Sequence, residues 1–334
     1  MKRYLNAIKY LLLFSVGAVL FYYVYKGLGV EKIAHELETL RWGWVWLSFV
    51  FAIVSHLSRA IRWNMLITPL GHKPRTLNTF LSIMIMYATN LIIPRGGELA
   101  RCTVLSRHEK IPFGTLAGTV VIERATDTLI LLLLVFITIF SQFSVFTAFV
   151  ANNPEFEQSF GFLFSLWFWL GGALLGIGTL ILLWIYREKL KRISFVAKII
   201  ELMTNFFQGI SSIKNLKKPG WYLFHSVFIY VMYFLMMYVI FFSYQPTEHL
   251  SMLAGLTAFI MGGLAMLAPV QGGIGAWHFM VLETLALYGL DKTDGKIFAL
   301  ISHTSMNLML LIVGAISFIL LPFFNKKKMN QTLY

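Results

Sequence analysis

Cysteine is almost absent from this chain, since Cys102 is the only one among 334 residues. A single cysteine excludes an internal disulfide and a cysteine-based metal cluster. Charged residues are scarce as well, at 13% of the chain against about 25% in soluble proteins, while hydrophobic residues reach 58% against about 45–50%. No region is long and polar enough to form a separate soluble domain. The composition therefore indicates one integral membrane domain that covers residues 1–334.

Recognised catalytic signatures are also missing. The sequence contains no nucleophile–base pair, HExxH motif, Walker loop or DxD-type cluster, so we expect neither an enzyme nor a bound cofactor or metal. One alternative is an intramembrane enzyme that transfers a lipid or a glycan from a polyprenyl carrier. It would need a metal-binding acidic pair or a base beside a cavity, and only Glu123 with Asp127 offers one. A further alternative is a scaffold for a partner lipid synthase.

The net charge of +13 has a membrane explanation. Basic residues cluster in short loops between apolar runs, which follows the positive-inside rule and predicts no nucleic-acid partner. Lys2, Arg3 and Lys9 at one end and the run 326–328 at the other place both termini in the cytoplasm of a multi-pass protein in the cell (inner) membrane. The first apolar run lacks a small-residue cleavage site, so we interpret it as an uncleaved anchor.

Long apolar runs set the expected fold, which is all-α and polytopic. A helix needs about 20 apolar residues to cross the hydrocarbon core. Six runs meet this length: about 9–27, 42–66, 112–141, 160–186, 220–244 and 296–322. A basic stretch at about 187–217 has helical apolar spacing, which predicts a cytoplasmic amphipathic helix on the membrane surface or against another loop.

Two further apolar segments, about 77–107 and 251–290, are interrupted by Pro94–Gly97 and Pro269–Gly273. The loop charges predict that the first begins and ends inside and the second begins and ends outside. We therefore expect two opposed re-entrant hairpins in inverted-repeat units of about 42–141 and 220–322. Two full crossings by 251–290 would give the same endpoints.

Interrupted apolar segments in matching positions of two halves are the best sequence indication of a transporter's binding site. We expect the glycines of both breaks to adopt positive φ and to free backbone N–H groups for an anion. Arg95 and Arg101 beside the first break could hold phosphate, and Glu98 could pair with Arg101. The alternative is that both breaks are ordinary tight turns.

Ionisable residues inside the run 112–141 are costly in a bilayer and indicate an interior or a cavity. Arg124 can pair with Asp127, whereas Glu123 and Asp127 share a helix face and need a cation between them, from a lipid amine, a distant arginine or a proton. The alternative is an ion-pair network that only holds helices together.

Other polar and small residues have simpler expected roles. We expect Arg59 to reach the inner-leaflet phosphates, and Glu283 to meet a partner in the core. Gly114 and Gly118 should allow close helix packing. His278, His303 and Asn307 should be hydrogen-bonded interior groups.

The segments NLIIPRGGELAR (90–101), VVIERATDTLILLLL (120–134) and APVQGGIGAWHFMVLETLALYG (268–289) resemble the flippase-like membrane family. That family includes the transmembrane region of lysylphosphatidylglycerol synthases, the multiple peptide resistance factor. The resemblance covers nearly the whole chain, and the motifs are specific only as a set. The matching residues are Arg62, Pro94, Gly96, Gly97, Glu98, Arg101, Glu123, Arg124, Asp127, Gly272, Gly273, Gly275 and Glu283.

The resemblance implies a protein that binds a phosphate-bearing lipid, either a phospholipid or a polyprenyl phosphate, and moves it between leaflets. A homo-oligomer or a partner synthase is compatible with it. Since the chain ends at Tyr334 without the soluble transferase domain of full synthases, we do not expect lysine transfer. The expected headgroup-binding residues are Arg62, Arg95, Gly96, Gly97, Glu98, Arg101, Glu123, Arg124, Asp127, Gln271, Gly272, Gly273 and Glu283.

Overall fold

The computed structural model describes residues 15–93, 96–145, 147, 166–185, 216–268 and 270–330, and within these residues the structure is helical with no strand. The expected amphipathic helix at about 187–217 lies outside the described residues except for residues 216 and 217, and Arg95 lies outside them as well. The chain forms two compact units, residues 1–135 with 216–334 and residues 136–215. In the second unit the described helix is the apolar α9 (Leu166–Ile185).

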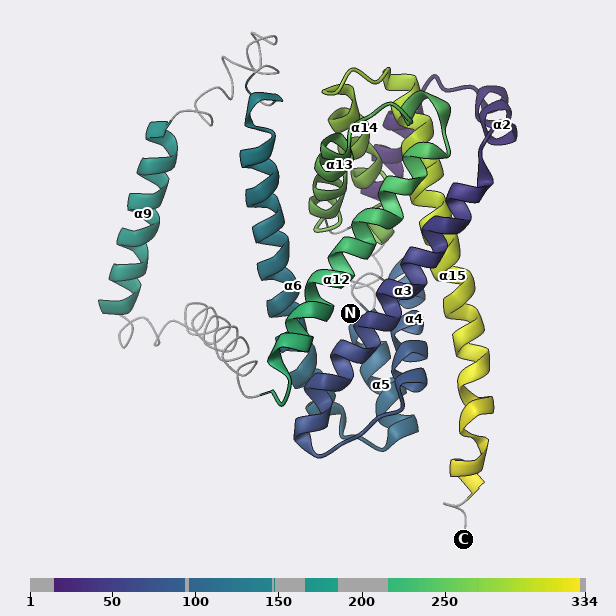
Figure 1. Cartoon of the computed structure of the whole chain (residues 1–334), viewed down its shortest axis with the longest axis vertical. Helices are drawn as coiled ribbons and strands as arrows, with labels where there is room; N and C mark the ends of the chain where they lie inside the picture. The colour runs from purple at the N-terminus through teal and green to yellow at the C-terminus, as the bar shows by residue number, and fades with distance from the viewer. Residues whose placement is uncertain are drawn as a thin grey trace, which may run out of the picture. The chain divides into compact units, whose positions relative to one another are not determined.

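The first unit contains the rest of the described helices, which Figure 1 labels. They are a helix at Ser15–Tyr25, α2 (Val30–Glu38), α3 (Trp42–Ile67), α4 (Thr76–Ile92), α5 (Gly97–Glu109), α6 (Phe113–Ser141, which ends in the second unit), α12 (Pro219–Tyr238), α13 (Met252–Ala265), α14 (Ala276–Ala286) and α15 (Lys292–Asn330). Short 3-10 turns follow α3 (Thr68–Leu70) and α12 (Val239–Phe242, Gln245–Thr247), and another, η6 (Gln271–Gly273), precedes α14.

Three described helical segments are long and apolar enough to cross a membrane: Trp42–Leu70, Pro219–Phe242 and Lys292–Asn325. They coincide with three of the predicted runs, so this part of the sequence reading is confirmed. The predicted run 112–141 forms α6, which has 29 residues and carries its charges near the middle. The full arrangement of six spans with opposed re-entrant hairpins stays a prediction.

Both interrupted segments form a pair of helices with a break between them. In the first, α4 packs against α5, and in the second, α13 packs against α14. The four arms have 17, 13, 14 and 11 residues, each shorter than the roughly 20 that a crossing needs. We call residues 90–97, from the last turn of α4 to the first residue of α5, the first break, and residues 266–275, between α13 and α14, the second break.

The two largest apolar cores of the first unit lie in different groups of helices. One lies among α3, α4, α5 and the start of α6 and contains the fully buried Trp63, Ile83 and Leu105. The other lies among α12, α13, α14 and α15 and contains Phe241 and Phe298. The long helices α3 and α12 pack against each other, and Figure 1 shows them side by side.

The glycines of the two breaks have different structural roles. Gly272 and Gly273 have φ of 56° and 73°, which confirms the expected positive φ at the second break. At the first break the expectation is wrong, since Gly96 has φ of −77° and Gly97 begins α5. Gly97 is required for another reason: a Cβ there would lie 2.3 Å from the Met86 carbonyl oxygen. The backbone of α5 thus approaches α4 too closely for any side chain.

Gly114 and Gly118 do not act as predicted in the described part of the chain. A Cβ built on either residue has no neighbouring heavy atom within 4 Å, so the expected close helix packing at these two positions is wrong. The glycines that do meet another helix closely are elsewhere. A Cβ on Gly255 would lie 2.6 Å from the Tyr238 ring, and one on Gly262 would lie 2.6 Å from the Trp277 indole nitrogen.

Candidate functional site: a buried charge cluster beside a cavity

Seven charged side chains from three helices meet inside the first unit. We call this group the charge cluster, and its members are Arg59 and Arg62 from α3, Glu98 and Arg101 from α5, and Glu123, Arg124 and Asp127 from α6. Isolated buried charges are unstable in a low-dielectric interior, so each must find an opposite partner. The cluster therefore determines how these three helices pack.

Glu123 is the centre of the cluster and is completely buried. Its two carboxylate oxygens lie within salt-bridge distance of all four arginines. The shortest contact is 2.8 Å, from Arg101 Nη1 to Oε2, and Arg62 Nη2 lies 3.2 Å from Oε1. Because one carboxylate contacts guanidinium groups from α3, α5 and α6, Glu123 connects all three helices.

Asp127 provides the second anionic position, one turn further along α6. Arg59 Nη2 and Arg62 Nη2 each lie 2.7 Å from one of its oxygens, and Arg124 Nη2 lies 3.1 Å away. The predicted pairing of Arg124 with Asp127 is therefore confirmed. The sequence analysis did not decide which cation lies between Glu123 and Asp127. In the structure, Arg59 and Arg62 of α3 contact both carboxylates. A divalent metal at this acidic pair would have to displace those arginines.

Arg59 is a correction to the sequence analysis. It does not extend to the membrane surface, because it is 4% exposed and its guanidinium donates to Asp127 and to the hydroxyl of Tyr87. The Tyr87 hydroxyl lies 2.8 Å from that of Tyr233 on α12. The sequence signal was available, since Ser55, Ser58, Arg59 and Arg62 form a polar stripe at helical spacing on an apolar span.

Arg101 is buried between two carboxylates and an aromatic ring. It has no exposed surface, its Nη2 lies 2.6 Å from Glu98 Oε2, and its guanidinium carbon lies 4.5 Å from the centre of the Trp63 ring. The predicted Glu98–Arg101 pair is thus confirmed. Arg101 has no surface with which to contact a phosphate directly, unlike Arg124, whose side chain is 42% exposed.

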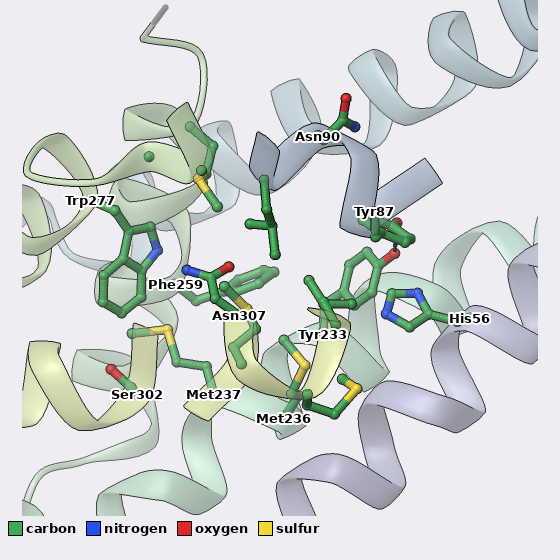
Figure 2. A pocket seen from close by; sticks show the side chains of 18 of the residues that line it. His56, Tyr87, Asn90, Tyr233, Met236, Met237, Phe259, Trp277, Ser302 and Asn307 are labelled. Atoms are coloured by element: carbon green, nitrogen blue, oxygen red, sulfur yellow. Dashed lines mark hydrogen bonds between the residues drawn. The ribbon is translucent and has the colours of Figure 1, made fainter. Parts of the chain in front are cut away.

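A cavity of about 530 Å³ lies beside the charge cluster, and we call it the first cavity. Figure 2 shows its interior, where aromatic and methionine side chains such as Tyr233, Phe259, Trp277, Met236 and Met237 form part of the wall. Glu98 and Arg124 are the only charged residues among the described residues that line it. The cavity also contacts both breaks, through Asn90 and Leu91 on one side and Gly272 and Gly273 on the other.

The two breaks are in direct contact with each other. The Gln271 side-chain amide donates to the Ile92 carbonyl oxygen at 3.1 Å, and Leu91 lies 3.2 Å from the position of a Cβ on Gly272. Gln271 therefore joins the two helix pairs. Their meeting also explains how a single cavity can reach both breaks.

Several backbone N–H groups of the breaks already have acceptors within the chain. The Gly97 N–H donates to Asn90 Oδ1 at 2.8 Å and the Gly275 N–H donates to His278 Nδ1 at 3.2 Å. Gly96 N–H donates to the Ile93 carbonyl. The expectation that the Gly-Gly pairs free N–H groups for an anion is wrong at Gly96 and Gly97, because a side chain and a turn carbonyl accept their hydrogen bonds.

Glu283 lies apart from this site. Its carboxylate is paired with Lys292 at 3.0 and 3.1 Å, and both side chains are well exposed, so the expected core partner is wrong. The structure thus brings together Arg62, Glu98, Arg101, Glu123, Arg124 and Asp127 in the charge cluster. It places Gly96, Gly97, Gln271, Gly272 and Gly273 at the two breaks. It adds Arg59, Tyr87 and Tyr233, which the sequence analysis did not select.

Comparison with known proteins places this geometry in a family. The chain matches the model of the lysylphosphatidylglycerol synthase TM region over residues 7–314. It is 30% identical over 222 residues to a UPF0104 membrane protein of Methanocaldococcus jannaschii, and this match covers 61% of the chain and 62% of that relative. No solved structure matches the chain. Because the family match includes the charge cluster and both breaks, this chain belongs to the family of the lysylphosphatidylglycerol synthase transmembrane region.

Proposed function

We propose that this membrane protein binds a phosphate-bearing lipid and moves it between the two leaflets. The observation that carries the proposal is the first cavity, which contacts both breaks and has Arg124 and Glu98 in its otherwise uncharged wall. A headgroup would occupy the charged end of this cavity, and the acyl or prenyl chains would lie along the apolar wall and in the bilayer. Non-helical backbone at membrane depth is tolerated where it lines such a cavity.

The charge of the cluster favours an anionic group. Four arginines face three carboxylates, so the cluster carries one positive charge in excess. Arg124 is the most exposed of the four arginines, and its guanidinium can offer two parallel N–H donors to a phosphate. We therefore assign phosphate binding to Arg124, and the three buried arginines hold the carboxylates that position it.

The proposed topology follows from the same features. The helices flanking the breaks are too short to cross the bilayer singly, and the two breaks meet through Gln271 and Ile92. We propose that the two helix pairs enter the membrane from opposite faces and meet near its middle. Transporters with inverted repeats place substrate sites at such a meeting of discontinuous helices.

A flux measurement on the full chain tests the proposal. The protein is reconstituted in liposomes with fluorescent phosphatidylglycerol, and the fraction of label that a membrane-impermeant quencher reaches is followed over time. We expect wild-type protein to accelerate exchange over protein-free liposomes and Arg124→Gln to slow it at least tenfold. Arg41→Gln is the matched control, since Arg41 is an exposed arginine paired with Glu248 away from the cavity.

The result also separates the alternatives. Equal exchange with and without wild-type protein would contradict lipid movement and favour a scaffold. Equal exchange by Arg124→Gln and wild type would contradict phosphate binding at Arg124. A parallel series with a fluorescent polyprenyl phosphate shows which class of lipid is moved. Conversion of either lipid to a new species, dependent on a divalent metal, would favour the enzyme.

A further inference from the structure

A second cavity, of about 650 Å³, borders the second break at Gln271, Gly272 and Ile274. The helix Ser15–Tyr25 forms one wall through Gly17, Ala18 and Phe21, and α15 forms another through Leu300, Leu308 and Leu311. The two cavities share Leu91, Gly272 and Asn307 as lining residues. Unlike the first cavity, the second has no charged residue among the described residues that line it.

Polar side chains nevertheless gather at this apolar site. His278, His303, Thr304 and Asn307 all line the second cavity. The rings of His278 and His303 have centroids 4.4 Å apart, and Asn307 Nδ2 lies 3.0 Å from His303 Nδ1. The two imidazoles and the amide therefore form one connected group.

The hydrogen bonds determine which nitrogen of each imidazole carries the proton. His278 Nδ1 accepts from the Gly275 N–H, so a neutral ring carries its proton on Nε2. His303 Nε2 donates to the Gly272 carbonyl oxygen at 2.8 Å, so its Nδ1 is the acceptor for the Asn307 amide N–H. Both rings are therefore neutral in this arrangement.

Two buried polar atoms of this group have no hydrogen-bond partner among the described residues: His278 Nε2 and Asn307 Oδ1. The first is an N–H donor and the second is a carbonyl acceptor. Leaving a buried donor or acceptor without a partner costs about 1–3 kcal/mol, so native proteins seldom leave them unpaired. His278 is only 1% exposed, so bulk water does not supply the missing partner.

We propose that the second cavity is a binding site for an uncharged lipid alcohol, such as a diacylglycerol. A hydroxyl group both accepts and donates, and therefore matches the free N–H donor of His278 and the free carbonyl acceptor of Asn307, two residues that line this cavity. The apolar walls suit an acyl chain, and the absence of charged lining residues disfavours a phosphate. Thr304 adds a further hydroxyl to the cavity wall. This site is independent of phosphate binding at Arg124.

Equilibrium binding of a fluorescent diacylglycerol to the full purified chain in detergent tests the proposal. We expect saturable binding that unlabelled dioleoylglycerol displaces, with triolein and dioleoyl phosphatidate at least tenfold weaker as competitors, because the first lacks a hydroxyl and the second carries charge. His278→Phe removes the free donor and should weaken binding about 3- to 10-fold, the usual range for one hydrogen bond. Asn307→Leu removes the free acceptor and should do the same.

Two more variants keep the test decisive if a buried substitution disturbs folding. Thr304→Val changes an exposed cavity-wall residue without a change in shape and should weaken binding about 2- to 5-fold. Arg124→Gln should bind diacylglycerol like wild type, so a failure of phosphate binding is distinguishable from a failure here. Equal competition by triolein, full affinity in all three cavity variants, or no saturable binding at all would overturn the proposal.

Discussion

Arg101 Nη1 lies 2.8 Å from Glu123 Oε2, and neither side chain has any exposed surface. This pair joins α5 to α6, two helices that the chain connects by only a short loop. Since Glu123 also contacts arginines of α3 and α6, the pair is part of a network and not an isolated bridge. The network holds Arg124 at the wall of the first cavity.

Replacing Arg101 should therefore reduce stability more than it changes lipid preference. Removing one partner from a buried ion pair typically costs about 3–5 kcal/mol, because the other charge stays buried. We expect Arg101→Ala to lower the thermal unfolding temperature of the purified protein strongly. Arg41→Ala, which breaks the exposed pair with Glu248, should cost about 0–1 kcal/mol. Equal effects of the two substitutions would contradict a structural role for the Arg101–Glu123 pair.

Gly97 offers a test of the close contact between α4 and α5. Alanine there would place a Cβ 2.3 Å from the Met86 carbonyl oxygen, so Gly97→Ala should destabilise the protein by about 1–3 kcal/mol. Gly114→Ala is the control, because it adds the same methyl group to a helix where nothing lies within 4 Å. We expect it to be neutral or to stabilise by up to about 1 kcal/mol. Thermal unfolding of both variants measures the difference, and a neutral Gly97→Ala would show that the helices can separate without cost.

Gly273 combines positive φ with a close neighbour. Gly273→Ala must adopt φ near 73° and must also move Met266, whose sulfur lies 2.3 Å from the new Cβ. Gly289 has φ of 83° but no neighbour within 4 Å, so Gly289→Ala reports the cost of backbone strain alone, about 1–2 kcal/mol. We expect Gly273→Ala to be the more destabilising of the two in a thermal unfolding experiment. The reverse order would contradict the packing of the second break.

The opposed hairpins predict which loops face the same side of the membrane. Single cysteines in a Cys102→Ser background should react with an impermeant thiol reagent from the cytoplasm at Lys73 and Lys110, which flank α4 and α5. A cysteine at His249, before α13, should react from the outside. All three residues are exposed in the structure, so accessibility does not limit labelling. Labelling of Lys110 and His249 from one side would rule out the inverted arrangement.

The sequence alone determined the class of protein and the position of its helices. Apolar runs of sufficient length, interrupted at Pro94–Gly97 and Pro269–Gly273, predicted α3, α6, α12, α15 and the two broken segments, because hydrophobicity and backbone propensity are local properties. The pairs Glu98–Arg101 and Arg124–Asp127 were also predictable, since residues three apart on one helix are neighbours.

Only the tertiary structure decided which distant residues meet. Arg59 was assigned to the membrane surface because its position near a helix end favours that reading, yet it lies buried against Asp127, 68 residues away in the chain. Glu283 was assigned to the core because of its apolar neighbours, yet the turn after α14 brings Lys292 to it. The spacing of residues on one helix carries no information about which face another helix covers. The partners of a charged side chain therefore depend on packing between helices.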